Sequence, residues 1–282
     1  MFLIFFSTEG VMSGIPIYNS PENLIFQEIP NEPPFKINTA RALLSKLRNG
    51  DYAHAGDRES IDMVIQKVLE RSPEIINGYS LDVGSGFGGT ANDFYRYGFH
   101  NIYGIDIDEA SVYYANKNYP HIKFLKTEAS NVTSLFEAEL FSFIYFFNVM
   151  YAIEDKKNTL KSLNAIAKPG ATLMIFDYID KGNDFLLTDL AGNPMYPINL
   201  KAFQEDLIGS GWEMLEVIDL SDKYIIWYEN LLDKLFQERV SLAQNFSKED
   251  IERVEFTFNR ILKWLKEASL GGILIFAKKQ LI

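Results

Sequence analysis

A glycine-rich turn that follows a short apolar run constrains the fold of this chain more than any other feature. The segment from Leu81 to Gly89 reads LDVGSGFGG, and helical periodicity follows it. Glycine lets the backbone turn sharply and approach a ligand with no Cβ in the way. In open α/β sheets such a turn lies at the carboxyl end of a strand, where adenosine-bearing ligands bind. The turn therefore predicts a ligand site at one edge of a largely parallel sheet.

Strands and helices are predicted to alternate around this turn. Strands are expected at 80–84, 101–106, 122–125, 141–147 and 171–177, and helices around 92–95, at 109–118 and at 154–167. The run Lys168-Pro169-Gly170 is expected to end the last helix and turn into the following strand. Such alternation implies right-handed crossovers and a mostly parallel sheet with helices on both faces. The predicted fold class is therefore α/β and Rossmann-like.

The segments on either side of this core are expected to add helices to it, not to form a second domain. One helix is expected from 38 to about 49, and the next has apolar residues at helical spacing at 61, 64, 65 and 68. After a loop-rich insert, the pattern predicts helices at 200–209, 224–244 and 247–269 and strands at 213–220 and 272–277. We expect a single domain over 1–282: an irregular segment (1–35), a helical cap (36–78), the cofactor-binding core (79–180), a substrate-side insert with helices (181–270) and a terminal strand (271–282).

Composition and charge argue against several classes of function. The formal net charge of -11 argues against a broad basic surface for nucleic acid. The chain has no cysteine, which excludes disulfides, thiolate catalysis and cysteine-ligated zinc. Its three histidines are scattered without metal-binding spacing, so no metal is expected.

The apolar runs are short throughout the chain. No run approaches membrane-spanning length, and the apolar start lacks the basic residues and the length of a signal core. We expect a cytoplasmic monomer or homodimer that acts on a small molecule and binds neither nucleic acid nor membrane. Met12 is an alternative start of the protein.

The glycine turn fits two cofactor classes, because Gly84, Gly86 and Gly89 also match the dinucleotide fingerprint. Asp82 distinguishes between the two cofactor classes. It lies two residues before the first glycine, where a dinucleotide strand keeps an apolar residue, and a carboxylate there suits the positive end of S-adenosylmethionine. Asp106, at the end of the second strand, can accept both ribose hydroxyls in either class. The residues therefore favour S-adenosylmethionine over NAD.

These residues resemble the class I methyltransferases over 50–177, and more loosely to 277. The resemblance implies a seven-stranded sheet that ends in an antiparallel pair, here 213–220 and 273–277. It implies that Ile107 packs on adenine and that Glu128, beside Ala129, approaches the adenine amine. The expected cofactor-binding residues are Tyr52, Asp82, Gly84, Ser85, Gly86, Asp106, Ile107, Glu128, Ala129 and Asn148. The expected product is S-adenosylhomocysteine.

A narrower resemblance concerns the methyl acceptor. The segment 50–56, GDYAHAG, is similar to the loop that closes over the cofactor in glycine, sarcosine, dimethylglycine and phosphoethanolamine methyltransferases. The phosphoethanolamine group has a catalytic Asp and His where this chain has Asn148 and Ala152, and a Lys where it has Leu274. No Arg lies near 193–196 to bind phosphate. We therefore expect a sarcosine- or dimethylglycine-like amine. The alternatives are phosphoethanolamine, an O or C acceptor, and a catalytically silent cofactor-binding protein.

The expected catalytic residues are His54, Asn148 and Tyr178. His54 lies on the loop that faces the cofactor and can take or relay the proton of the amine, although a loop histidine can also only pack. Asn148 ends the fourth strand, and Tyr178 follows the fifth. Tyr52, Tyr151 and Tyr196 are further candidates to line the pocket, while His100, His121, Trp227 and Tyr228 are expected to be structural. Residues 52–57 and 184–199 are expected to form a lid.

Overall fold

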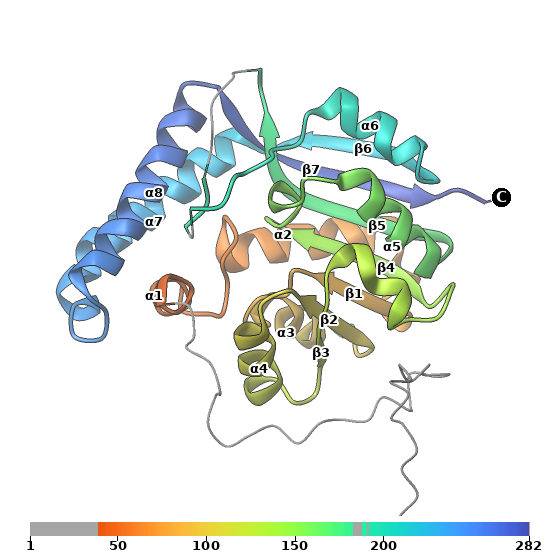
Figure 1. The fold of residues 1–282 in the computed structure, drawn as a ribbon, viewed down its shortest axis with the longest axis horizontal. Helices are drawn as coiled ribbons and strands as arrows, with labels where there is room; N and C mark the ends of the chain where they lie inside the picture. Colours follow the sequence, from red (N-terminus) through yellow and green to blue (C-terminus); the bar gives the residue numbers. More distant parts are fainter. Residues whose placement is uncertain (1–38, 183–187, 191, 282) are drawn as a thin grey trace, which may run out of the picture.

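All seven strands of the described residues belong to one sheet in this computed structural model, which describes residues 39–182, 188–190 and 192–281 (Figure 1). The strand order is β3-β2-β1-β4-β5-β7-β6. The strands are β1 (Tyr79–Val83), β2 (Ile102–Asp106), β3 (Lys123–Lys126), β4 (Phe141–Phe147), β5 (Ala167–Asp180), β6 (Trp212–Asp219) and β7 (Leu270–Lys279). Neighbours are parallel except that β7 runs antiparallel to both β5 and β6. The predicted α/β class and the antiparallel pair at the end of the sheet are confirmed.

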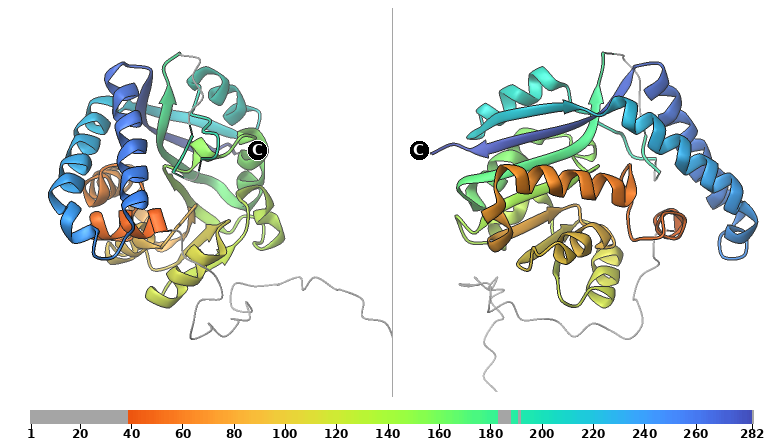
Figure 2. Two further views of the ribbon diagram at one scale, coloured as in Figure 1. Left: turned by 60° about the vertical axis from the view of Figure 1, so that its left-hand side comes forward. Right: turned by 180° about the vertical axis from the view of Figure 1, so that it is seen from behind.

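Helices cover both faces of the sheet, and each face has its own buried core (Figure 2). One face is covered by α1 (Thr39–Leu47), α2 (Asp57–Arg71), α3 (Gly89–Arg96), α4 (Glu109–Asn118), α7 (Ser221–Leu242) and α8 (Lys248–Lys266). The other is covered by the 3₁₀ turn η3 (Ala129–Ser134), α5 (Lys156–Ile166) and α6 (Leu200–Ile208). Two short 3₁₀ turns, η2 (Pro73–Asn77) and η4 (Met150–Ala152), precede β1 and α5. Strands buried on both faces explain why the sequence reads as near-continuous apolar runs.

The order of the strands places the glycine turn where the sheet topology reverses. β1 lies between β2 and β4, so the connections that leave β1 and β4 go to opposite sides. Ligands of open α/β sheets bind at the carboxyl ends of strands at such a switch point. The fold therefore directs attention to the carboxyl ends of β1, β2, β4 and β5.

The long helices α7 and α8 form an antiparallel hairpin between β6 and β7, and α1 lies beside them (Figure 1). Hydrogen bonds fix this arrangement: the Thr39 hydroxyl donates to Asp250 over 2.9 Å, and the Ser247 side chain caps α8 by accepting from the Asp250 amide over 3.1 Å. The hairpin thus adds a wall to the ligand edge of the sheet.

The helices and strands predicted within the described residues are confirmed, with one correction. The run Lys168-Pro169-Gly170 does not form a turn before β5, because the strand already begins at Ala167. The pairing of β4 with β5 shifts register there, and Gly170 has a φ of 74°. An irregularity inside the strand absorbs the proline and the glycine.

Two expectations concern residues outside this description. The irregular segment 1–35, with the alternative start at Met12, lies outside the described residues, as do 184–187 and 191 of the expected lid. Within the described part of the chain, no helix is long and apolar enough to cross a membrane.

Candidate functional site

The glycine turn leaves β1 with three left-handed residues. Gly84, Gly86 and Gly88 have φ values of 73°, 53° and 90°. A Cβ on Gly84 would overlap the Val149 side chain, so this glycine is needed for contact with the segment that follows β4. A Cβ on Gly86 would meet nothing closer than the Arg41 guanidinium at 3.8 Å. The turn is therefore closely packed at its start and open at its middle, as a ligand cradle requires.

Asp82 lies beneath this turn as a buried carboxylate. It is 2% exposed, and its neighbours across the sheet are Gly104 and Tyr145. Its Oδ2 atom makes no hydrogen bond of ordinary geometry among the described residues, and the Tyr145 hydroxyl, which lies near enough to oppose the rise of its pKa, makes none either. Burial, and then the charge of Asp106, raises the pKa of Asp82 well above its usual range. A cationic ligand group nearby would offset both the burial and the repulsion.

Asp106 lies at the end of β2, where its carboxylate accepts hydrogen bonds from the backbone amides of two turns. Its Oδ2 accepts from the Gly86 amide over 2.8 Å, and its Oδ1 accepts from the Asp108 amide over 2.8 Å. Arg41 of α1 is 3.8 Å from Asp106 Oδ2. The next residue, Ile107, is 69% exposed, which is unusual for a large apolar side chain. A carboxylate beside an uncovered apolar surface matches what a ribose with its adenine requires.

Glu128 and Ala129 lie further along this edge, after β3. Glu128 is exposed, and Ala129 is half-buried at the start of η3. The amide of Thr127 donates to the Asp106 carbonyl over 3.1 Å, so the ends of β2 and β3 are tied together. The structure thus brings the predicted adenine residues to the same edge as Asp106.

Residues 50–57, here called the lid loop, pack directly on the glycine turn. The Asp51 backbone would lie 2.8 Å from a Cβ placed on Gly89. The Asp51 carboxylate accepts from the hydroxyls of Tyr114 and Tyr119, over 3.1 and 2.5 Å. The Tyr52 hydroxyl donates to Asp93 of α3. The loop is therefore fixed at its base by α3 and α4.

His54 points inward from the lid loop and is 3% exposed. Its Nδ1 lies 3.0 Å from the Ala55 carbonyl, so this nitrogen carries the proton and donates. Its Nε2 then accepts from the Thr90 hydroxyl over 3.1 Å. Burial lowers the pKa of His54 to about 4. The imidazole is neutral near neutral pH and both nitrogens are engaged, which favours a positioning role for this side chain.

Asn148 joins three elements at the carboxyl end of β4. Its Oδ1 accepts from the Ala55 amide of the lid loop over 2.9 Å, and its Nδ2 donates to the Tyr224 hydroxyl of α7 over 3.2 Å. Its φ is 51°, a left-handed conformation that asparagine tolerates better than most residues. Asn148 thus links the lid loop, the sheet edge and the helical hairpin.

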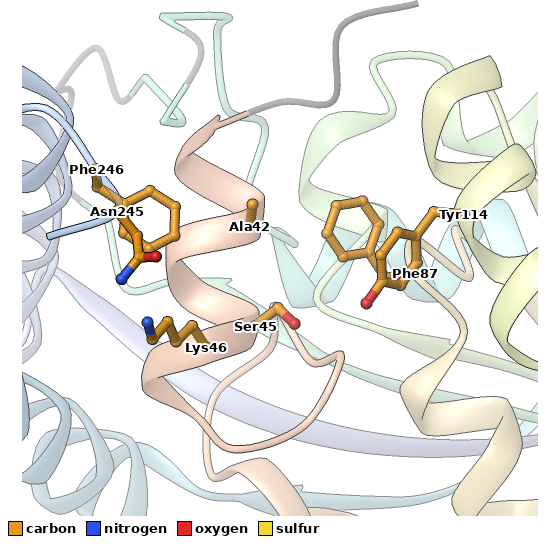
Figure 3. A pocket seen from close by; sticks show the side chains of 7 residues that line it. All are labelled: Ala42, Ser45, Lys46, Phe87, Tyr114, Asn245 and Phe246. Carbon is orange, nitrogen blue, oxygen red and sulfur yellow. The ribbon is translucent and has the colours of Figure 1, made fainter. Parts of the chain in front are cut away.

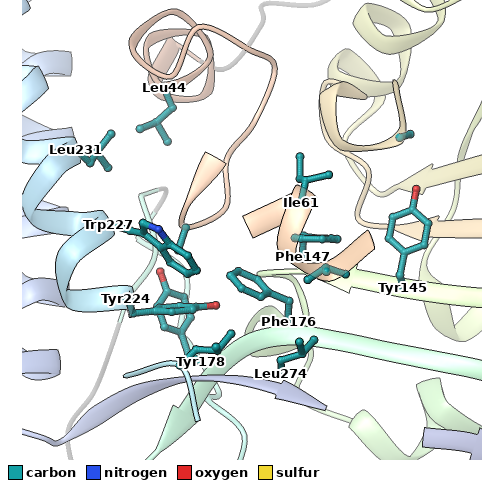
Figure 4. Close-up of a cluster of buried hydrophobic side chains, with 14 of the residues drawn as sticks. Leu44, Ile61, Tyr145, Phe147, Phe176, Tyr178, Tyr224, Trp227, Leu231 and Leu274 are labelled. Carbon is teal, nitrogen blue, oxygen red and sulfur yellow. The ribbon is translucent and has the colours of Figure 1, made fainter. Parts of the chain in front are cut away.

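Four tyrosines from three elements gather next to Asn148, and we call them the tyrosine cluster: Tyr151, Tyr178, Tyr224 and Tyr228. Figure 4 shows two of them, Tyr178 and Tyr224. The ring of Tyr178 lies 5.3 Å from that of Tyr151 and 5.6 Å from that of Tyr224. The hydroxyls of Tyr178 and Tyr228 form a hydrogen bond. Burial raises the pKa of all four phenols, so they stay protonated. The cluster is an apolar wall with hydroxyls in its interior.

Asp177 fixes the two strand ends that carry Asn148 and Tyr178. Its Oδ2 accepts from the Val149 and Met150 amides over 2.8 and 2.7 Å, and its Oδ1 accepts from the Tyr178 amide over 2.7 Å. Burial raises the pKa of Asp177 to about 6, although these amides oppose the shift. The carboxylate is engaged by backbone and acts as a structural clamp.

A pocket of about 300 Å³ lies along α1, on the outer side of the glycine turn (Figure 3). Phe87, stacked on Tyr114 at 4.3 Å, forms one wall, and Phe246 of the α7–α8 connection forms another. The remaining lining residues are Ala42, Ser45, Lys46 and Asn245. The pocket is distinct from the tyrosine cluster and contains none of the predicted site residues.

The other predicted residues lie apart from the tyrosine cluster or fill its surroundings. Tyr196 is bound through its backbone to the Tyr151 carbonyl over 2.6 Å, and its ring lies by Lys156. Trp227 is buried beside Tyr224, as expected for a core residue. His100 and His121 are exposed and contact the ring of Tyr95. Among the described residues no three His, Cys, Asp or Glu side chains are grouped to hold a metal ion.

Tyr224 contacts Asn148, and Arg48 is buried against Asp57 and Phe258; the sequence pattern predicts neither. At Tyr224 the pattern predicts only the start of a helix, and at Tyr228 a core position. Their spacing of four residues places both on one face of α7, which is a signal available in the sequence. Arg48 gives no such signal, since its burial depends on α2 and α8.

The sequence comparisons agree with this geometry. A family model described as a methyltransferase domain matches residues 52–254. Phosphoethanolamine N-methyltransferase 1 of Zea mays is 24% identical over 244 residues, which make up 84% of this chain and 47% of that protein. The chain therefore spans about half the length of this curated relative.

Two solved structures have similar folds. Phosphoethanolamine N-methyltransferase 2 of Haemonchus contortus, bound to phosphomonomethylethanolamine and S-adenosylhomocysteine, has a TM-score of 0.73 at 16% identity, over 86% of this chain and 57% of that one. A putative sarcosine dimethylglycine methyltransferase from Galdieria sulphuraria has a TM-score of 0.67 at 14% identity, over 79% of this chain and 85% of that one. At such identities these likenesses establish the fold alone.

Proposed function

The chain belongs to the family of S-adenosylmethionine-dependent methyltransferase domains, and from this premise we propose that it methylates the nitrogen of a small, sarcosine- or dimethylglycine-like amine. The tyrosine cluster is the observation that carries the proposal. Aromatic faces stabilise the cationic ammonium that forms when an amine gains a methyl group. The cluster lies beside Asn148, whose neighbour Val149 contacts Gly84 of the cofactor turn. The acceptor wall therefore adjoins the cofactor edge.

The described residues fit the cofactor of this family. The open left-handed Gly86 accommodates a close ligand, the buried Asp82 carboxylate suits a cationic group, and Asp106 with Ile107 suits a ribose and its adenine. When bound, S-adenosylmethionine supplies a methyl group on a sulfonium that needs no further activation.

The protein's own contribution is to orient the amine, exclude water and keep the nucleophilic nitrogen unprotonated. We propose that Asn148 sets the distance between the lid loop and α7, and that the tyrosine cluster holds the amine. Neutral His54 supports the lid loop through Thr90 and the Ala55 carbonyl. No residue here needs to act as a strong base, because an amine that enters unprotonated attacks directly.

Phosphoethanolamine is the second candidate acceptor, favoured by the names of two relatives. A phosphate dianion needs several cationic or hydrogen-bonding partners. Ala152 and Leu274 stand where the phosphoethanolamine group has polar residues, and the arginine expected to bind phosphate has no clear counterpart near 193–196. The residues of this chain therefore support an acceptor with less charge.

A panel of acceptors in one methyl-transfer assay tests the proposal. Radiolabelled S-adenosylmethionine is supplied with glycine, sarcosine, dimethylglycine, phosphoethanolamine and a catechol as an O-acceptor. We expect transfer to sarcosine or dimethylglycine. Transfer to phosphoethanolamine or the catechol, with the other amines inert, would contradict it. Cofactor binding with no turnover on a wider panel would point to a silent binding protein.

Tyr178→Phe and Tyr178→Ala test the role of the cluster. The phenylalanine variant loses only the hydroxyl contact to Tyr228, so we expect turnover to change by less than roughly fivefold. The alanine variant removes the aromatic face, and we expect KM for the amine to rise by roughly tenfold or more. Equal activity of the two variants would argue against an aromatic contact with the amine.

A further inference from the structure

Arg48 is a buried arginine that the proposed reaction does not yet use. It continues the last turn of α1, and its side chain is 2% exposed. Its Nη1 forms an ion pair with Asp57. Its Nε and Nη2 atoms have no hydrogen-bond partner among the described residues. A guanidinium buried with two unused donors is costly, so this side chain calls for an explanation.

The two unused donors lie side by side on one edge of the guanidinium. Nε–H and one N–H of Nη2 point in parallel from the same edge of the planar guanidinium. This edge matches the two oxygens of a carboxylate or of another oxo anion, which it binds through two parallel hydrogen bonds. Asp57 occupies the other end of the guanidinium and leaves this edge available.

One aromatic ring, that of Phe258, separates Arg48 from the tyrosine cluster. Its guanidinium carbon is 5.9 Å from the ring centre of Phe258, and Phe258 stacks on Tyr228 at 5.3 Å. Tyr228 in turn bonds to Tyr178. Burial sets the pKa of both His54 and Tyr228, and the charge of Arg48 acts on each as well. The arginine therefore lies close to both the lid loop and the acceptor wall.

Two other cations near the site are engaged differently. Arg41 lies at the ribose end, where it bonds to Ser111 and pairs with Asp106 and Asp108. Lys156 donates to the Ile153 carbonyl over 2.6 Å. Arg48 thus has the better geometry for a ligand at the tyrosine cluster.

We propose that Arg48 binds an anionic oxo group of the methyl acceptor through its Nε and Nη2 edge. The inference rests on the proposed function and deepens it, because it makes the acceptor an amine that carries a carboxylate. Asp57 balances the single charge of Arg48, so a phosphate dianion would leave more negative charge unbalanced at this buried site than a monoanion would.

Arg48→Gln and Arg48→Lys in the full chain test this inference. Glutamine removes both the positive charge and the pair of parallel N–H donors. Lysine keeps the charge but also lacks the paired donors. Arg58→Gln is the matched control, because Arg58 lies next to Asp57 but is largely exposed. KM is measured for sarcosine, for N-methylethanolamine, which replaces the carboxylate by a hydroxymethyl group, and for phosphoethanolamine.

We expect Arg48→Gln to raise KM for sarcosine by roughly 10- to 100-fold and to leave KM for N-methylethanolamine within about twofold. Arg48→Lys should fall between Arg48→Gln and the unchanged protein, and Arg58→Gln should resemble the latter. If the Arg48 variants lost affinity for phosphoethanolamine alone, Arg48 would still be an anion site, but the anion would be a phosphate and the inferred carboxylate would be wrong. Equal effects on sarcosine and N-methylethanolamine would overturn the inference and leave amine methylation intact.

Binding without turnover separates this inference from the proposed function. Calorimetry measures dimethylglycine binding to protein saturated with S-adenosylhomocysteine, and thermal unfolding confirms that each variant folds. If no amine is methylated, the proposed function fails. Arg48-dependent binding of dimethylglycine would still support the anion site, and binding that is unchanged in both Arg48 variants would overturn it.

Discussion

The proposed cofactor half of the site is built from one short stretch of chain, whereas the proposed acceptor half draws on four distant ones. Asp82, the glycine turn and Asp106 lie within two consecutive strands and contribute backbone amides and carboxylates. The acceptor half combines the lid loop, Asn148, Tyr178 and α7, and it is made of side chains. A contiguous backbone site tolerates little change, because its shape is fixed by φ angles. A side-chain site assembled from separate elements can change its ligand without disturbing its neighbour.

This contrast predicts that variants of the cofactor half lower cofactor affinity, and that variants of the acceptor half affect the amine and the lid loop. The strongest test is Gly84→Ala. A Cβ here would overlap Val149, and the φ of 73° disfavours any residue with a side chain. We expect the free energy of unfolding to fall by about 2–4 kcal/mol and the affinity for S-adenosylhomocysteine to fall by roughly 100-fold.

Denaturant unfolding and calorimetry measure these two effects. Gly182→Ala is the control, since Gly182 has a φ of 101° but no atom within 4 Å of an added Cβ. Its stability should fall by about 1–2 kcal/mol from backbone strain, with cofactor affinity unchanged. If both variants lost the same amount of cofactor affinity, the effect of Gly84→Ala would not come from its place in the glycine turn, and the contrast between the two halves of the site would be contradicted.

A second test uses the pH dependence of stability in the acceptor half. The pKa of His54 is lowered to about 4 in the folded protein, from an ordinary value of 6.5. Its contribution to stability is therefore fully present above pH 6.5 and is lost as the pH falls toward 4. Asp177 has the opposite dependence on pH, because its pKa is raised from 3.8 to about 6 in the folded protein. Its contribution to the free energy of unfolding is fully present below pH 3.8 and is lost as the pH rises through 6.

Comparison with His54→Gln isolates the histidine, because the Asp177 contribution cancels in the difference. We expect the difference in unfolding free energy between the two proteins to change by about 3 kcal/mol between pH 7.5 and pH 4, in favour of the unchanged protein at high pH. Urea titrations at several pH values measure it. Parallel stability profiles would show that His54 titrates normally.

Asp106→Ala sharpens the assignment of the cofactor half. The variant loses the carboxylate that accepts from the Gly86 and Asp108 amides and that we propose as the ribose ligand. We expect the binding free energy of S-adenosylhomocysteine to weaken by about 1–3 kcal/mol. Glu109→Ala, three residues further along the chain, removes an exposed carboxylate and should have no effect. Calorimetry that finds Asp106→Ala unchanged would mean that another residue holds the ribose.

Asn148→Ala has the smallest expected effect and tests the link between lid loop and hairpin. It removes the bonds to the Ala55 amide and the Tyr224 hydroxyl, so we expect a loss of about 1–2 kcal/mol in stability and faster hydrogen exchange at Ala55. Asn148→Asp keeps the acceptor for the Ala55 amide and offers a second oxygen that can accept from the Tyr224 hydroxyl, so it should restore the protection. A lid loop equally protected in all three proteins would show that Asn148 does not hold it.

The same contrast explains how far the sequence could predict the molecule. The sheet and the proposed cofactor half could be predicted from local patterns. The glycine turn, Asp82 and Asp106 belong to two strands, each of which can be recognised from its own sequence. The surroundings of His54 could not be predicted, because its burial depends on Thr90 of α3 and Phe147 of β4. Arg48 could not be distinguished from an ordinary surface arginine until α2 and α8 enclosed it.

The helical hairpin has an evolutionary consequence, because the chain enters it from β6 and leaves it into β7, two strands that are neighbours in the sheet. A segment inserted between adjacent antiparallel strands can lengthen, shorten or be exchanged while the order of the sheet stays the same. Tyr224, Trp227 and Tyr228 all lie on this segment. The sequence of the hairpin, and with it the surroundings of the tyrosine cluster, can thus change while the strands at the proposed cofactor edge keep their order.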